Sequence, residues 1–155
     1  MTEPNLRQAT RTWLPVIAWA ALIWYLGGDD FGTTRSDGML GPLLEWLFPW
    51  IGTEGQVFAL WLIRRSAHPA IYGVLALLAW RATAGTFPAL GPVRQTALIL
   101  SLVASLAAAD EYRQAGSTLR EGHASDVALD IAGAAMALGA RAGWASRRKR
   151  GSAQA

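Results

Sequence analysis

Residues 110–133 have the sequence DEYRQAGSTLREGHASDVALDIAG and join two long apolar segments. This stretch places the polar groups of Asp110, Glu111, Gln114, Arg120, Asp126 and Asp130 beside those segments or between them. An ionisable side chain beside hydrocarbon costs several kcal/mol unless it is paired or hydrated. A set of such groups at two adjacent segment ends therefore predicts a polar site at this junction.

Four apolar segments are long enough to be helices that cross a membrane: residues 12–28, 67–84, 93–109 and 127–144. Each is near the lower end of the roughly 17–25 residues that a span requires. The chain is 52% hydrophobic and 16% charged, against about 25% charged in soluble domains. We therefore predict an all-α integral membrane bundle of four transmembrane helices over residues 12–145. A soluble bundle with buried helices is the alternative.

A long connection, residues 29–66, separates the first two segments. It opens with polar turn residues as far as Gly38 and continues with two apolar pieces, residues 39–51 and 56–63, that contain Trp46, Trp50 and Trp61. Pro and Gly residues interrupt both pieces. We predict short helices that lie at the membrane interface or pack on the bundle, with a re-entrant hairpin as the alternative. Pro69 fits the first turn of the helix that follows.

The distribution of basic residues predicts the topology. Four spans place both termini on one side, which then carries Arg7, Arg11, Arg81, Arg94, Arg141 and the run Arg147, Arg148, Lys149 and Arg150. By the positive-inside rule this side is the cytoplasm, although Arg64 and Arg65 on the other side count against it. We expect a bacterial inner-membrane protein with a cytoplasmic tail at residues 1–11 and a basic, disordered cytoplasmic tail at residues 146–155. The polar junction then faces away from the cytoplasm.

The composition also excludes several classes of partner and chemistry. The chain has no cysteine, so disulfides, thiolate metal ligands and a cysteine nucleophile are excluded. Its net charge is +3, but a basic run directly after an apolar helix is more simply a membrane anchor. We therefore expect the lipid bilayer as a partner and no nucleic acid.

Helical spacing places the acidic residues on shared faces. Asp110 and Gln114 are four residues apart, and Glu111 and Gln114 are three apart, so each pair lies on one helix face. Asp126 is at the start of the last segment, where the simplest interpretation is a helix N-cap. Asp130 lies one turn deeper among Ala, Leu and Ile, and it is tolerable there only with a partner.

Basic and aromatic residues from elsewhere are expected to meet these acids. Arg120, in the intervening loop, would either pair with a carboxylate of the junction or hold a phosphate or carboxylate of a ligand; both interpretations stay open. His68 and Tyr72 are four residues apart at the start of the second segment, with Arg65 one turn before. They lie on the same predicted side as the acids. The alternative is that His68 has a structural role only. Arg113, Glu121 and His123 are expected to be solvated.

Signature motifs for phosphate loops, H-E-x-x-H zinc sites and G-x-S-x-G nucleophiles are absent. Asp110, Glu111, Asp126 and His68 are residue types that can bind a metal. Their spacing is not diagnostic of a metal site, so we assign no metal ligands, and the sequence leaves the cofactor unknown.

The ordered set of these residues resembles the VanZ-like family of bacterial membrane proteins. The family pattern is an acidic pair followed by Gln, a loop Arg and an Asp that opens the last span. The matching residues are Asp110, Glu111, Gln114, Arg120, Asp126, Asp130 and Gly133. An earlier element, a basic residue followed by His and Tyr, matches Arg65, His68 and Tyr72. The resemblance covers residues 64–138, and the chain departs from it at residues 115–119 and at Pro69.

The resemblance implies a cell-envelope protein, because the family is named for a protein linked to low-level resistance to the glycopeptide teicoplanin. We hypothesise an outward-facing pocket that binds a lipid-linked or cell-wall ligand. The alternative is a membrane enzyme acting on an envelope lipid or precursor, with Glu111 or Asp110 as general base, His68 as acid or metal ligand, and Arg120 as an electrophilic clamp. A third interpretation is that the polar residues only fasten the bundle.

Overall fold

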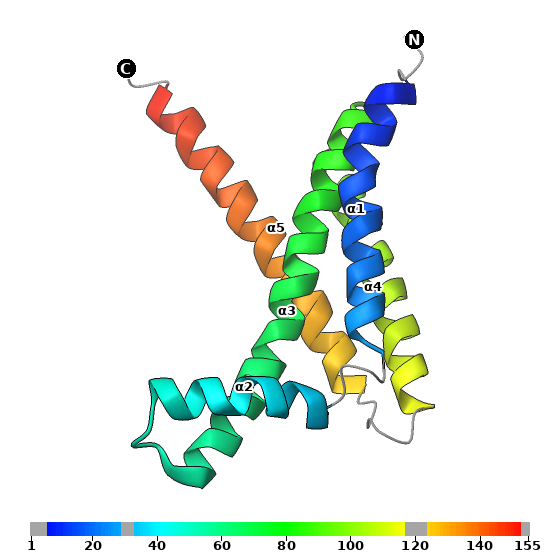
Figure 1. Ribbon diagram of the computed structural model, residues 1–155. Coiled ribbons are helices and arrows are strands. Elements are labelled where there is room, and N and C mark those ends of the chain that lie inside the picture. The colour runs from blue at the N-terminus through cyan, green and yellow to red at the C-terminus, as the bar shows by residue number, and fades with distance from the viewer. Residues whose placement is uncertain (1–5, 29–32, 117–123, 153–155) are drawn as a thin grey trace.

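The long helix α3 (Gly52–Thr86) is the centre of the fold. The computed structural model describes residues 6–28, 33–116 and 124–152. The other helices are α1 (Leu6–Leu26), α2 (Thr33–Leu47), α4 (Pro92–Ala115) and α5 (Ala124–Ser152), and each of them packs against α3 (Figure 1). These residues form no strand, which confirms the predicted all-α class.

Small side chains on α3 let the other helices approach closely. Ala76, Ala79 and Ala82 are completely buried, and small residues at a helix contact bring the two backbones together. Around them the core takes Val16 and Ile23 from α1, Ile99, Val103 and Ala107 from α4, and Ala134 and Leu138 from α5. The core therefore runs along the second half of α3, between Tyr72 and Ala82.

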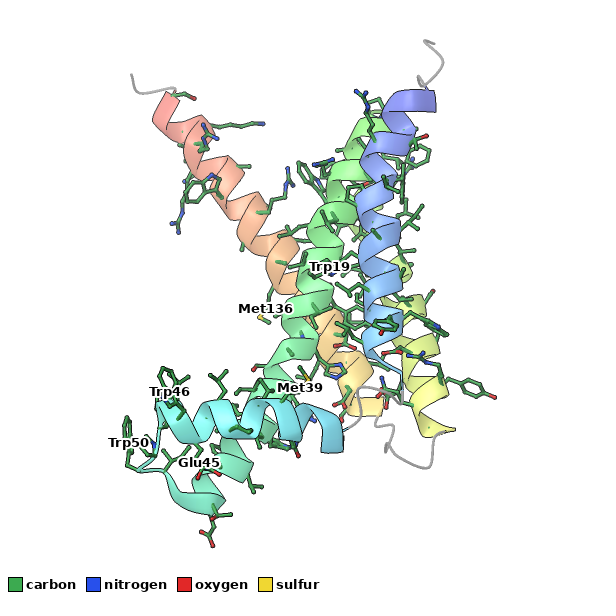
Figure 2. The ribbon with its side chains drawn as sticks, in the orientation of Figure 1. Trp19, Met39, Glu45, Trp46, Trp50 and Met136 are labelled. Atoms are coloured by element: carbon green, nitrogen blue, oxygen red, sulfur yellow. The ribbon has the colours of Figure 1, made fainter. Side chains whose placement is uncertain are left out.

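Polar side chains tie neighbouring helices to α3. The indole Nε1 of Trp19, which lies between α1 and α3 (Figure 2), donates a hydrogen bond of 3.0 Å to the carbonyl of Ile71. The Gln95 amide, 9% exposed, donates a hydrogen bond of 2.8 Å to the Thr83 hydroxyl and so links α4 to α3. Each bond satisfies a polar group that would otherwise be buried among apolar neighbours without a partner.

α5 crosses α3 at a contact between small residues. A Cβ built on Gly133 would lie 2.7 Å from the carbonyl carbon of Pro69 and closer still to its carbonyl oxygen. One turn along α3, a Cβ on Gly73 would lie 3.3 Å from the carbonyl oxygen of Gly133. The two backbones can meet here only because Gly133 has no side chain.

The connection between α1 and α3 differs from the expectation. α2 begins at Thr33, within the segment expected to form a polar turn. Residues 56–63 are not a separate short helix, because α3 runs without a break from Gly52 through Pro69. Pro69 removes only one backbone donor, and its backbone packs on Gly133. An ion pair between Arg64 and Asp37 fastens α2 to this first part of α3.

The expected tails are largely helical within the described residues. α1 begins at Leu6, and α5 continues through the basic residues as far as Ser152, whereas we expected disorder from residue 146. Lys and Arg are good helix formers, and their charge is favourable at a helix C-terminus. The start of α1 and the end of α5 lie at one end of the bundle, and the end of α4 and the start of α5 lie at the other (Figure 1).

Many large apolar side chains lie on the outside of these helices. The exposed ones include Leu14, Ile17 and Trp24 on α1, Val74 and Leu77 on α3, Val93, Leu98 and Leu102 on α4, and Met136 and Trp144 on α5. Figure 2 shows Trp46 and Trp50 at the end of α2 farthest from the bundle. Judged by length and hydropathy, one helix of the described residues, α4, is apolar enough to cross a membrane.

Candidate functional site

The predicted polar residues gather at the end of the bundle that is opposite the chain termini. Here the end of α1, the end of α4 and the start of α5 surround the middle of α3 (Figure 1). Each helix supplies part of the site. The predicted residues among the described ones are Arg65, His68 and Tyr72 on α3, Asp110, Glu111 and Gln114 on α4, and Asp126 and Asp130 on α5.

Asp110 is the best satisfied of the buried acids. Its carboxylate is 5% exposed and accepts hydrogen bonds of 2.6 Å from Nη2 of Arg113 and 2.9 Å from Nε2 of Gln114. Nη2 of Arg113 also donates to the carbonyl of Trp24 at 2.8 Å, and the guanidinium carbon lies 4.2 Å from the centre of the Trp24 ring. These contacts bind the end of α4 to the end of α1.

Gly27 makes room for this arrangement. A Cβ at Gly27 would lie 2.6 Å from Nη2 of Arg113 and 2.7 Å from Oδ2 of Asp110. Such distances are shorter than real Cβ contacts. The turn at the end of α1 therefore approaches the Asp110–Arg113 pair as closely as a backbone without a side chain allows.

Arg113 is the functional residue that sequence reasoning missed. We expected it to be solvated, and that expectation is wrong, because its side chain is 31% exposed and pairs with Asp110. The i, i+3 spacing of Asp110 and Arg113 was the available signal. Arg120, which we expected to pair with a carboxylate or a ligand, lies outside the described residues, as do Glu121 and His123.

Two further pairs join α3 to α5. Nη1 of Arg65 donates to Oδ1 of Asp126 at 2.9 Å, and Nδ1 of His68 lies 3.5 Å from Oδ1 of Asp130. Asp126 lies in the first turn of α5, where its charge also suits the helix dipole. Asp130 is 4% exposed, so the deep carboxylate has the nearby partner that its position requires.

Tyr72 interacts with acidic residues of both α4 and α5. Its side chain is 2% exposed, and its hydroxyl is close enough to Asp110, Asp130 and Glu111 to interact with them electrostatically. His68 likewise interacts with Asp110 as well as with Asp130. An imidazole, a phenol and carboxylates from α3, α4 and α5 therefore converge at this end of the bundle.

A hollow of about 470 Å³ lies beside the Asp110–Arg113 pair, between the ends of α1 and α4. The residues lining it are Gly27, Gly28, Tyr112, Arg113, Gln114, Ala115 and Gly116. Within residues 6–28, 33–116 and 124–152, no group of three or more His, Asp or Glu side chains is arranged to hold a metal ion. The carboxylates, guanidinium groups, imidazole and phenol of the described residues can form hydrogen bonds and recognise charge.

No family model, curated protein or solved structure matches this chain. Its function is therefore argued from the residues and their arrangement.

Proposed function

We propose that the chain is a VanZ-like protein of the bacterial inner membrane, with four spans and a polar pocket that binds a cell-envelope ligand. The observation that carries this proposal is the convergence of buried polar side chains from α3, α4 and α5. Asp110, Gln114 and Asp130 are less than a tenth exposed. Residues separated by some forty positions in the sequence meet there. Burying this many polar groups is costly, and a binding role explains why the cost is tolerated.

The membrane setting is supported by the outer surface of the helices. Large apolar side chains are exposed on α1, α3, α4 and α5, and soluble monomers rarely expose such contiguous apolar surface. Trp46, near the end of α2, and Trp50, in the turn that follows it, are both at least 75% exposed, and exposed Trp side chains are typical of the membrane–water interface. The spans in this proposal are α1, the second half of α3, α4 and the first part of α5.

The relation to VanZ-like proteins is supported by the position of the residues that carry the resemblance. Arg65, His68 and Tyr72 belong to one motif, and Asp126 and Asp130 to another. The two motifs contact each other through Arg65–Asp126 and His68–Asp130. Motifs that form one site are expected to occur together in a family. A contribution to teicoplanin-type resistance is the phenotype that this relation suggests.

The topology gives the first test. A reporter that is active only in the cytoplasm, fused after residue 155, is expected to be active, because the basic residues of α5 mark the cytoplasmic side. The same reporter inserted between α4 and α5 is expected to be silent. An active reporter at that junction would place the polar site in the cytoplasm and contradict an envelope ligand.

The binding role gives the second test. Glu111→Gln and Asp126→Asn are expected to abolish complementation of a deletion strain for teicoplanin sensitivity while the protein accumulates normally. Asp37→Asn is the control, because Asp37 pairs with Arg64 on α2 and α3, outside the site. Full complementation by the site variants would show that these polar residues serve only to hold the helices of the bundle together. Lipid and muropeptide profiles then separate binding from catalysis, because an accumulated precursor indicates an enzyme.

A further inference from the structure

Within the described residues, one end of the bundle carries basic side chains and no acidic ones. At this end, here called the basic end, α1 and α4 begin and α3 and α5 finish (Figure 1). The described residues 6–28, 66–109 and 131–152, which include this end, contain no Asp or Glu. Their Arg and Lys residues are Arg7, Arg11, Arg81, Arg94, Arg141, Arg147, Arg148, Lys149 and Arg150. The described part of the basic end is therefore strongly positive and attracts an anionic partner.

α5 separates from the other helices as it approaches the basic end. Leu138 is its last buried residue among the described ones, and after Leu138 only Arg141 and Ala145 are partly buried. Figure 1 shows this half of α5 diverging from α1 and α3. Arg141, Ala145 and Arg148 follow each other at spacings of four and three residues, so they lie on one helix face. That face is turned towards α3, because Arg141 contacts Trp80.

The guanidinium group of Arg141 is held in place but lacks an anion. Its carbon lies 3.1 Å from the centre of the Trp80 ring on α3. At the other end of the bundle, Arg113 lies in the same way over Trp24 and also binds the Asp110 carboxylate. The N–H groups of Arg141 lie in the guanidinium plane, available to acceptors. Within residues 6–28, 33–116 and 124–152 they have no hydrogen-bond or ion-pair partner.

We propose that Arg141, held over Trp80, binds the phosphate of an anionic phospholipid. This proposal rests on the membrane setting of the proposed function and adds a second site, remote from the polar pocket. The guanidinium donates paired N–H hydrogen bonds to the phosphate oxygens. Arg148 lies about 10 Å farther along the same face, close enough to strengthen the attraction. In the proposed topology the basic end meets the cytoplasmic leaflet, whose anionic lipids attract such residues.

Exposed apolar side chains next to these groups favour a lipid over a free phosphate. Trp144, one turn after Arg141 on α5, is 69% exposed, and Leu77, one turn before Trp80 on α3, is 38% exposed. Acyl chains can pack against such side chains, whereas a free phosphate has no apolar part. An exposed Trp beside basic residues is also typical of the membrane–water interface.

The test uses the purified full-length chain in a non-ionic detergent. Dioleoylphosphatidylglycerol is expected to raise the thermal unfolding midpoint saturably, whereas dioleoylphosphatidylcholine, whose head group has no net charge, is not. Arg141→Gln is expected to weaken phosphatidylglycerol binding about tenfold, since it removes hydrogen bonds between charged groups. Arg148→Gln is expected to weaken it about fivefold. Arg64→Gln is the matched control, because it removes one positive charge that pairs with Asp37, away from the basic end, and it is expected to bind normally.

Arg148→Gln keeps the proposal falsifiable if Arg141→Gln does not fold, because Arg148 is on the exposed part of α5. Equal stabilisation by the two lipids would overturn the proposal, and so would unchanged phosphatidylglycerol affinity in either folded variant. A response to glycerol phosphate equal to that of the lipid would show that acyl chains play no part, and would overturn a lipid site. A stronger response to an RNA oligonucleotide at the same salt concentration would do the same.

Failure of this proposal is distinguishable from failure of the proposed function. If both lipids stabilise the chain equally, the basic end has no site for an anionic head group, but the membrane setting stands. If the chain is monomeric without detergent and neither lipid changes its unfolding midpoint, the membrane setting fails as well. Complementation by Glu111→Gln tests the polar pocket separately, because Glu111 lies near the end of α4, at the other end of the bundle.

Discussion

Replacement of Gly133 by alanine is expected to lower the free energy of unfolding by about 3 kcal/mol, the upper part of the usual range for overpacking. The new methyl group would meet the backbone of Pro69, which has no rotamer by which to move aside. The only relief is separation of α5 from α3, which would open the principal helix contact of the fold. Thermal or denaturant unfolding of the purified protein, followed by tryptophan fluorescence, measures the loss.

Gly139→Ala is the matched control for this prediction. Gly139 lies on the same helix, and a Cβ at Gly139 meets nothing within 4 Å. Alanine also has the higher helix propensity, by up to about 1 kcal/mol, so Gly139→Ala is expected to be neutral or stabilising. Equal stability of Gly133→Ala and the natural chain would show that α3 and α5 do not meet at Gly133.

The Gly133 variant is also expected to damage the polar site. The Arg65–Asp126 and His68–Asp130 pairs lie within two turns of the crossing. Moving α5 outward lengthens both pairs, because each has one partner on α3 and the other on α5. The crossing of small residues is thus the feature that positions the acids of α5 against the basic groups of α3.

Arg113→Met is expected to destabilise the protein by about 2 kcal/mol. Within the described part of the chain, it leaves the Asp110 carboxylate buried with only the Gln114 amide as a donor, and it removes the stacking on Trp24. Loss of one partner from a fully buried ion pair costs about 3–5 kcal/mol. The smaller value reflects the 31% exposure of the Arg113 side chain, because solvent screens the pair. Denaturant unfolding, followed by far-UV circular dichroism, measures the effect.

Arg64→Met is the control for Arg113→Met. The Arg64–Asp37 pair is exposed by about a third or more on both partners, so its loss is expected to cost less than about 1 kcal/mol. Adding Asp110→Asn to Arg113→Met is expected to recover part of the lost stability, because the unpaired carboxylate is then neutral. Equal costs for Arg113→Met and Arg64→Met would contradict the buried pair.

Much of this fold was predictable from local pattern. Apolar runs interrupted by polar junctions indicate helices, and the described residues form helices and no strand. Spacing of three and four residues placed Asp110, Glu111 and Gln114 on one face of α4. Local pattern did not predict that residues 56–63 continue into the helix expected at residues 67–84, since Gly and Pro residues occur both at the break after α2 and inside the helices. Local propensity is a weak guide where packing decides.

The choice of partners was not predictable in the same way. Arg120, for which the sequence suggested either a carboxylate partner or a ligand contact, lies outside the described residues. Among the described residues, Asp110 is paired with Arg113 from its own helix, and Asp126 with Arg65 from sixty positions away. The Arg65–Asp126 pairing depends on which helix faces meet and at what distance. Gly27 and Gly133 set those distances through the side chain that each lacks.

The sequence by itself determined that the chain is helical and that its costly polar groups lie beside the ends of apolar segments, because composition and periodicity are local properties. Only the tertiary structure decided that α3 continues through Pro69 and that His68, Tyr72, Asp110 and Asp130 share one site. The physical reason is that ion pairing and close packing act between residues remote in sequence. Their energies therefore depend on how the helices cross.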